Sequence, residues 1–156
     1  MRRAKPEKRE ILPDIRYNST TIQTMIHHML HRGKKSTATR VMYDTLDIIR
    51  EHSGGKDPVE IFDTAMRNVA PGMEVRPRRV GGATYQVPME VPPARRATLA
   101  IRWVLDAANA RSGKSFAQKL ADELMDAFKN EGASIRKREE THKMAEANRA
   151  FSHYRM

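Results

Sequence analysis

The sequence predicts a mainly α-helical protein: a bundle of about six helices with one protruding two-stranded β-hairpin. Apolar residues recur at helical spacing through most of the 156 residues. Residues 73–91 instead place β-branched side chains around a Gly-Gly pair, which is typical of a hairpin. Hydrophobic residues make up 39% of the chain, so the length allows one core beneath a large polar surface.

The first two helices are predicted from their apolar faces and their flanking residues. Residues 20–31 carry apolar side chains at i, i+3, i+4, i+7 and i+8. Thr20 and Gln23 have the spacing of a capping box, and Gly33 is placed to end the helix. Residues 36–52 form the second apolar face and end before a Gly-Gly pair.

The third helix and the hairpin follow one another. Asp57 is a predicted N-cap, and Pro58 occupies the first helical position. In the hairpin, Gly81-Gly82 marks the turn, and Pro77 and Pro88 lie on opposite arms. Proline belongs on edge strands, so we expect an isolated ribbon that projects from the helices. Such a ribbon is marginal in water alone, so we expect a partner to steady it.

Three further helices and a short tail are predicted after the hairpin. The fourth covers residues 94–110 and has a broad apolar face. The fifth begins at Ser115, with a glutamine at capping-box spacing, and ends at Gly132. The sixth, residues 134–148, is strongly charged and has only a thin apolar stripe. The tail AFSHYRM follows.

The net charge of +10 is unevenly distributed along the chain. Residues 1–40 carry a net +7, residues 71–114 carry +5 and residues 136–156 carry +3. Residues 41–70 and 115–135 are net acidic, at −3 and −2. A basic pI serves solubility without such separation. The blocks therefore favour a polyanionic partner that is bound by the basic segments.

The ribbon carries the most informative basic cluster. Strand alternation puts Arg76 and Arg78 on one face and Arg79 on the other. Tyr85 on the return strand has a ring that can stack on a base. One or two charges are enough to guard an edge strand against aggregation, so three arginines in four positions indicate contact with nucleic acid. Their removal is expected to change folding little.

Several other functions are disfavoured. The chain has no cysteine, and no apolar run is long enough for a bilayer or a signal peptide; we expect a cytoplasmic protein that binds no membrane. The run at residues 33–36 lacks the first glycine of a P-loop. His27 and His31 are spaced like a metal pair but have no third ligand nearby, and Glu123 and Asp126 are interpreted as surface acids at salt-bridge spacing. We therefore expect no cofactor, no metal and no catalysis.

Five segments resemble the family of small-subunit ribosomal protein seven, bacterial type, nearly end to end and in the right order. These segments are ILPD (Ile11 to Asp14), GKKSTA (Gly33 to Ala38), RRVGGATYQVPMEV (Arg78 to Val91), the LA-IRW-AA pattern (Leu99 to Ala108) and KREETHKMAEANRAFSHYR (Lys137 to Arg155).

The resemblance implies a structural role in the ribosome. Members bind the lower part of the 3′ major domain of small-subunit ribosomal RNA and nucleate assembly of the subunit head. They lie near exit-site transfer RNA and the messenger RNA path, beside ribosomal proteins nine and eleven. On this view the chain is one RNA-binding domain, residues 1–156, with a basic arm at 1–18 that we expect to be disordered alone, a ribbon at 73–91 and a tail at 149–156.

The basic and aromatic positions together give the predicted RNA-binding residues. They are Arg2, Arg3, Lys5, Arg9, Lys34, Lys35, Arg76, Arg78, Arg79, Tyr85, Arg95, Arg102, Arg111, Lys114, Arg136, Lys137, Lys143, Arg149 and Tyr154.

Two other classes of protein remain open from the residues alone. An architectural DNA-binding protein could use the ribbon as an arm, although such proteins are usually dimers. An RNA-modifying enzyme would require a cofactor pocket, and its discovery would favour that class.

Overall fold

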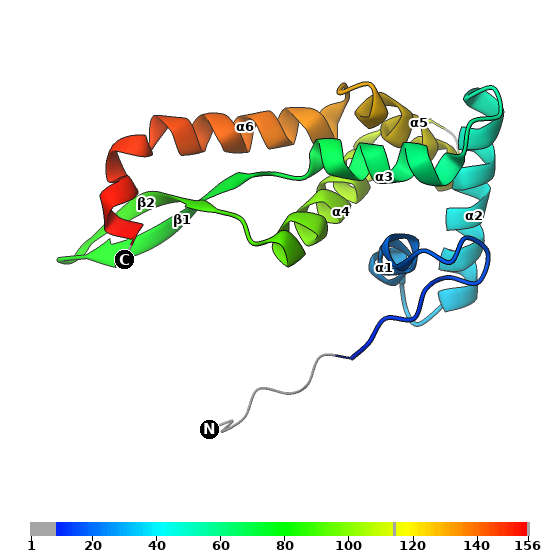
Figure 1. The fold of residues 1–156 in the computed structure, drawn as a ribbon, viewed down its shortest axis with the longest axis horizontal. Coiled ribbons are helices and arrows are strands. Elements are labelled where there is room, and N and C mark those ends of the chain that lie inside the picture. Colours follow the sequence, from blue (N-terminus) through cyan, green and yellow to red (C-terminus); the bar gives the residue numbers. More distant parts are fainter. Residues whose placement is uncertain (1–8, 114, 156) are drawn as a thin grey trace.

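The computed structural model describes residues 9–113 and 115–155. Within these residues the chain is mainly helical, with one two-stranded antiparallel hairpin, which confirms the predicted fold class. Figure 1 shows helices α1 to α5 gathered at one side and the hairpin at the other, with α6 running alongside the hairpin. The elements are α1 (Thr20–Met29), α2 (Lys35–His52), α3 (Pro58–Val69), β1 (Met73–Val80), β2 (Ala83–Glu90), α4 (Pro93–Ala110), α5 (Phe116–Phe128), α6 (Ala133–Ala147) and the 3-10 helix η1 (Arg149–Arg155).

The start of α1 differs by one residue from the prediction. Ser19, not Thr20, is the N-cap, and its hydroxyl accepts the N–H of Ile22 at 3.3 Å. The carboxylate of Asp14 accepts the N–H of Ser19 at 2.9 Å and so fixes Ser19 just outside the helix.

Three other predicted helix boundaries have different outcomes. Helix α1 stops at Met29, so the prediction that Gly33 ends it is wrong; this glycine belongs to a separate turn. The prediction for Asp57 is confirmed, because its carboxylate accepts the N–H of Val59 at 3.0 Å. Ser115 is the N-cap of α5 but makes no capping bond through its side chain.

The core forms where the predicted apolar faces meet. Helix α5 contacts α2, α3, α4 and α6, so it is the element around which the others pack. Burial of each large apolar side chain contributes about 1.5–3 kcal/mol. Trp103 is partly buried against this core. Fully buried side chains include Ile22, Met25, Ile26, Met42, Leu46, Ile49, Phe62, Val69, Leu120 and Leu124.

The ribbon pairs in the predicted register about its glycine turn. Val80 lies opposite Ala83, and the two glycines between them have φ of 57° and 89°. Positive φ at both central positions is the requirement of a type I′ turn, whose twist matches that of the strands.

The ribbon is supported by the C-terminal part of the same chain, contrary to our expectation that a partner steadies it. Helix α6 contacts both strands, and η1 packs against β2 (Figure 1). The rings of Tyr85 and Tyr154 stack with centroids 4.9 Å apart, and Phe151 lies 5.4 Å from Tyr85. Val87 and Val91 are fully buried. The ribbon therefore contributes more to the folded protein than the sequence indicated.

Glu123 joins three segments at the other end of α6. Its side chain is fully buried, so its interpretation as a surface acid is wrong. One carboxylate oxygen accepts the N–H and the hydroxyl of Ser134, at 2.9 and 2.6 Å. The other accepts from Arg111 at 2.8 Å, and Arg111 also pairs with Asp126. A Cβ on Gly132 would lie 2.9 Å from the carboxylate, so only glycine fits there.

We expect Glu123→Ala to lower the free energy of unfolding by about 2–4 kcal/mol, because it leaves the buried donors of Ser134 without their acceptor and removes one of the two carboxylates that hold Arg111. Glu131→Ala, which alters an exposed acid nearby, should change it by less than about 0.5 kcal/mol. Urea unfolding monitored by circular dichroism measures both values, and equal losses of stability would contradict this role.

His142 fastens α6 to the base of the ribbon. Its Nε2 accepts the N–H of Gly72 at 3.0 Å, immediately before β1. Burial, with a smaller contribution from Arg138, lowers the pKa of His142, so the fold favours the neutral imidazole that can accept this bond. Because the pKa is lower in the folded chain, the stabilisation is complete above the unfolded value of about 6.5 and is lost as the pH falls through the folded value.

The free energy of unfolding should therefore fall more steeply on acidification in the wild type than in His142→Gln. The glutamine carbonyl can accept the same N–H but does not titrate. Denaturant unfolding between about pH 7.5 and about pH 5 measures the difference. His52→Gln, at an exposed position, should keep the wild-type slope; parallel curves for His142→Gln and the wild type would rule out the contribution.

Candidate nucleic-acid interface

The predicted RNA-binding residues fall into groups according to whether they form an ion pair with a described carboxylate. Arg2, Arg3, Lys5 and Lys114 lie outside the described residues, and Arg9 is exposed. Within the described chain, one group is already engaged with carboxylates: Arg76, Arg95, Arg111, Lys137 and Arg149. A second group has no ion pair with any described residue: Lys34, Lys35, Arg78, Arg79, Arg102, Arg136 and Lys143.

At the base of the ribbon, a buried acid engages two of the predicted arginines. Only 9% of the Glu74 side chain is exposed, and it pairs with Arg76 at 2.5 Å and with Arg95 at 2.9 Å. Arg95 belongs to α4, so this cluster fastens β1 to that helix. A carboxylate removed from water requires such partners. These two arginines therefore have a structural task that the sequence did not reveal.

Arg78 and Arg79 lie further along β1, toward the turn. Arg78 pairs with Tyr85 across the ribbon and Arg79 with Thr84, so the two side chains occupy opposite faces as predicted. No described carboxylate forms an ion pair with either. The expectation that the ribbon arginines are dispensable for folding is thus restricted to Arg78 and Arg79.

Two aromatic residues that are predicted to contact RNA, Tyr85 and Tyr154, stack on one another. The planes of Tyr85 and Tyr154 are inclined by 28°, and both side chains are partly buried. The ring of His153 lies 4.0 Å from that of Tyr154. This cluster joins η1 to the ribbon, which gives both tyrosines a structural role.

Arg111 is likewise engaged inside the protein. Burial alone would lower its pKa, but the bonds from Asp126 and Glu123 raise it above the ordinary arginine value. Its guanidinium is therefore held by two carboxylates, and it is a poorer phosphate ligand than its sequence position suggested.

Lys34 and Lys35 are both exposed where the turn between α1 and α2 ends: Lys34 is the N-cap of α2 and Lys35 its first residue. The N–H of Lys34 bonds the carbonyl of His31 at 3.1 Å, and Arg32 and Gly33 between them have φ of 52° and 76°.

Helix α1 ends at Met29, between the two histidines that were considered as a metal pair. His27 bonds Gln23 at 2.8 Å within α1, whereas His31 lies beyond the helix end.

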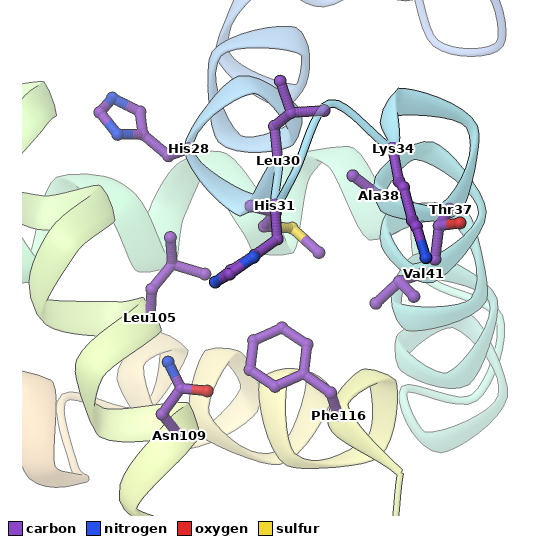
Figure 2. Close-up of a pocket in the computed structure, with 11 residues that line it drawn as sticks. His28, Leu30, His31, Lys34, Thr37, Ala38, Val41, Leu105, Asn109 and Phe116 are labelled. Carbon is purple, nitrogen blue, oxygen red and sulfur yellow. The ribbon is translucent and has the colours of Figure 1, made fainter.

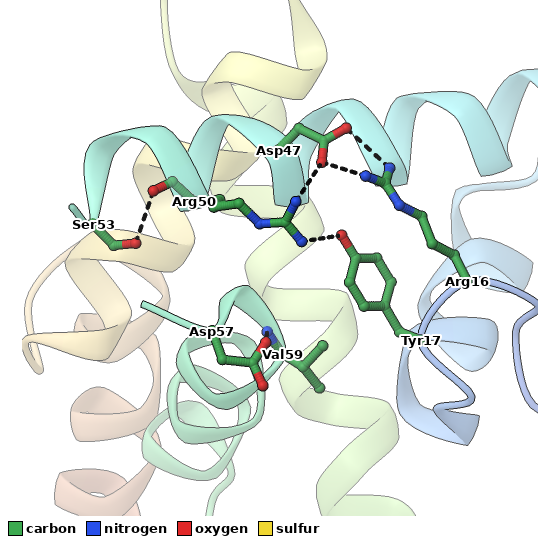
Figure 3. Close-up of polar contacts among 7 residues, drawn as sticks. All are labelled: Arg16, Tyr17, Asp47, Arg50, Ser53, Asp57 and Val59. Carbon is green, nitrogen blue, oxygen red and sulfur yellow. Dashed lines mark hydrogen bonds and ion pairs between the residues drawn. The ribbon is translucent and has the colours of Figure 1, made fainter. Parts of the chain in front are cut away.

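Residues 14–17 of the N-terminal arm are fixed to α2, which corrects the expectation of disorder for this part of residues 1–18; residues 1–8 lie outside the described residues. Asp14 is buried and accepts the N–H groups of Arg16 and Tyr17 and the hydroxyl of Tyr43, at 3.1, 2.9 and 3.2 Å. Figure 3 shows Arg16 bonded to both oxygens of Asp47, at 2.8 and 3.0 Å.

This anchor was missed by the sequence analysis. A signal was available, because aspartate commonly bonds the backbone N–H two residues on. The described part of the arm is therefore anchored beside α2.

Exposed lysines on a turn and arginines on a ribbon, apart from acidic side chains, form a surface suited to a polyanion. Comparison of the sequence with known proteins identifies the family of the chain. A family model described as ribosomal protein S7p/S5e matches residues 1–149. The chain belongs to this family of ribosomal proteins.

Curated relatives named small ribosomal subunit protein uS7 agree over nearly the full chain. The protein from Thermoanaerobacter sp. (strain X514) is 56% identical over 99% of this chain and 98% of its own length. The protein from Caldanaerobacter subterraneus subsp. tengcongensis is 57% identical over 95% of this chain and 94% of its own length. The protein from Parasynechococcus marenigrum is 55% identical over 99% of this chain and 98% of its own length. The chain is thus a structural component of the small ribosomal subunit, not an enzyme. No helix in the described part of the chain is long and apolar enough to cross a membrane.

The division of the arginines gives a paired test in the free protein. Arg76→Ala with Arg95→Ala should lower the free energy of unfolding by about 2–3 kcal/mol, because Glu74 is left buried without its partners. Arg78→Ala with Arg79→Ala removes the same charge and should change it by less than about 0.5 kcal/mol. Urea titration measures both, and equal effects of the two double variants would contradict the division.

Proposed function

We propose that this protein binds the 3′ major domain of small-subunit ribosomal RNA and organises the head of the subunit. The observation that carries the proposal is the exposed turn at Lys34 and Lys35 and the ribbon arginines Arg78 and Arg79, whose charges no described carboxylate neutralises. Phosphates are the expected counter-charges. The resemblance of the sequence motifs supports the choice of this RNA.

The rest of the basic surface completes the proposed contact. Arg102, Arg136 and Lys143 are exposed and extend the cationic surface over α4 and α6. The basic arm, residues 1–18, would add contacts beyond the anchor at Asp14. We propose that residues 1–156 act as one RNA-binding domain.

The ribbon is the proposed approach to a second RNA. It lies at one end of the molecule (Figure 1), and its arginines alternate between faces. A narrow ribbon with cations on both faces can contact two nucleic-acid segments at once. The family resemblance supports exit-site transfer RNA and messenger RNA here, and ribosomal proteins nine and eleven as neighbours.

Binding to RNA should fall steeply with salt, because phosphate contacts release counterions. Lys34→Gln with Lys35→Gln should reduce the slope of log affinity against log salt by about 0.7–0.9 for each lysine that neutralises a phosphate in the wild type. Lys56→Gln with Lys129→Gln, at exposed lysines beside the acidic segments, should leave the slope unchanged. Filter binding to a transcript of the 3′ major domain measures both.

Specificity is checked in the same assay with a transcript of the 5′ domain and with duplex DNA at matched salt. The 3′ major domain transcript should bind most tightly. Tighter binding to DNA would favour an architectural DNA-binding protein, and a salt-independent affinity would exclude phosphate contact as the mode of binding.

A further inference from the structure

A pocket lies where the end of α1, the start of α2, α4 and the start of α5 meet (Figure 2). Its volume of about 360 Å³ falls within the range of small-molecule sites. Its wall residues are His28, Met29, Leu30, His31, Lys34, Thr37, Ala38, Val41, Leu105, Asn109 and Phe116.

The pocket has an aromatic and aliphatic interior. Figure 2 shows the ring of Phe116 and the imidazole of His31 pointing into the same space, with Leu105 and Val41 beside them. Phe116 packs against the core but is only partly buried, so part of its surface is available to a ligand. A flat ring in the pocket would contact both side chains.

The polar groups around this interior are uncommitted. The side chains of His31, Lys34 and Asn109 make no hydrogen bond to any described residue, whereas the neighbouring His27 bonds Gln23. None of the pocket residues is acidic. The hollow at the α5–α6 junction differs, because four acids line it beside Arg111 and Arg136: Glu123, Asp126, Glu131 and Glu139.

The turn between α1 and α2 fixes two of these groups at the rim. The backbone bond from Lys34 to His31 closes it, and both residues within it are left-handed. The backbone that carries these two side chains is therefore already ordered before a ligand binds, which favours affinity.

We propose that this pocket holds one unstacked nucleobase of ribosomal RNA, an inference that rests on the proposed function. Phe116 and His31 stack on the base, the Asn109 amide bonds its edge, and Lys34 contacts the adjoining phosphate. Unpaired bases of RNA are recognised by aromatic stacking together with hydrogen bonds to the base edge. The cationic rim without carboxylates favours RNA over a side chain of a neighbouring protein.

The first test compares two phenylalanines of α5 that both pack partly buried on the core, Phe116 and Phe128. Phe116→Leu keeps apolar packing but removes the stacking face. It should weaken binding to the 3′ major domain transcript by about fivefold or more, with an unchanged salt slope because no charge is removed. Phe128→Leu should bind like the wild type.

Exposed positions give a second test that does not disturb the core. Asn109→Ala should weaken binding by about threefold to tenfold, and His31→Ala should also weaken it, while the exposed His52→Ala should not. Chemical probing of base edges with dimethyl sulfate and a carbodiimide should show one nucleotide that the wild type protects and Asn109→Ala does not.

Two failures can be told apart. If the wild type does not prefer the 3′ major domain transcript, the proposed function fails. If the wild type prefers it but Phe116→Leu matches Phe128→Leu, or Asn109→Ala protects every nucleotide that the wild type protects, the pocket does not hold a base. A protein side chain as occupant would give this second result.

Discussion

The arrangement of the helices and the ribbon depends on the hydrogen bonds that the buried carboxylate of Glu123 accepts. It accepts from Arg111, before α5, and from Ser134, in the first turn of α6. It thereby sets where α6 begins, and α6 runs along both strands of the ribbon. Gly132 allows the backbone to pass close to the carboxylate. A bonded acid within the bundle therefore determines where the ribbon lies at the far end, and a purely apolar junction would specify the direction of α6 less sharply.

Buried acids also divide the positive charge between folding and binding. Glu74 and Glu123 engage arginines that would otherwise add to the basic surface. The charge that remains for a partner lies where α1 and α2 join, toward the tip of the ribbon, and at exposed positions of α4 and α6. The 29 lysines and arginines of the chain therefore overstate the number of cations available to a polyanion. The positions of the cations that are unpaired in the described chain, rather than their number, determine where a polyanion can bind.

The helices and the hairpin could be predicted because their signals are local: apolar spacing, an N-cap such as Asp57, and a Gly-Gly turn. The exposed Lys34 was predictable for the same reason. The task of Arg95 was not, because its partner Glu74 is distant along the chain and no local pattern marks that acid as buried. The pocket was hidden for a similar reason, since its walls come from four helices. In the sequence, Phe116 is only an apolar residue at the start of a helix. Its place in the pocket depends on the end of α1, which lies opposite it in the structure.

The packing of η1 against the ribbon has a consequence for how the protein is made. A chain that emerges from the ribosome N-terminus first releases both strands well before Phe151 and Tyr154. During that interval the ribbon lacks the rings that contact Tyr85, and a hairpin with few partners is only weakly stable. The bundle helices α1 to α5 can pack meanwhile, because none of them contains residues from this segment. The ribbon thus matures last, and its completion coincides with the arrival of the final turn of the chain.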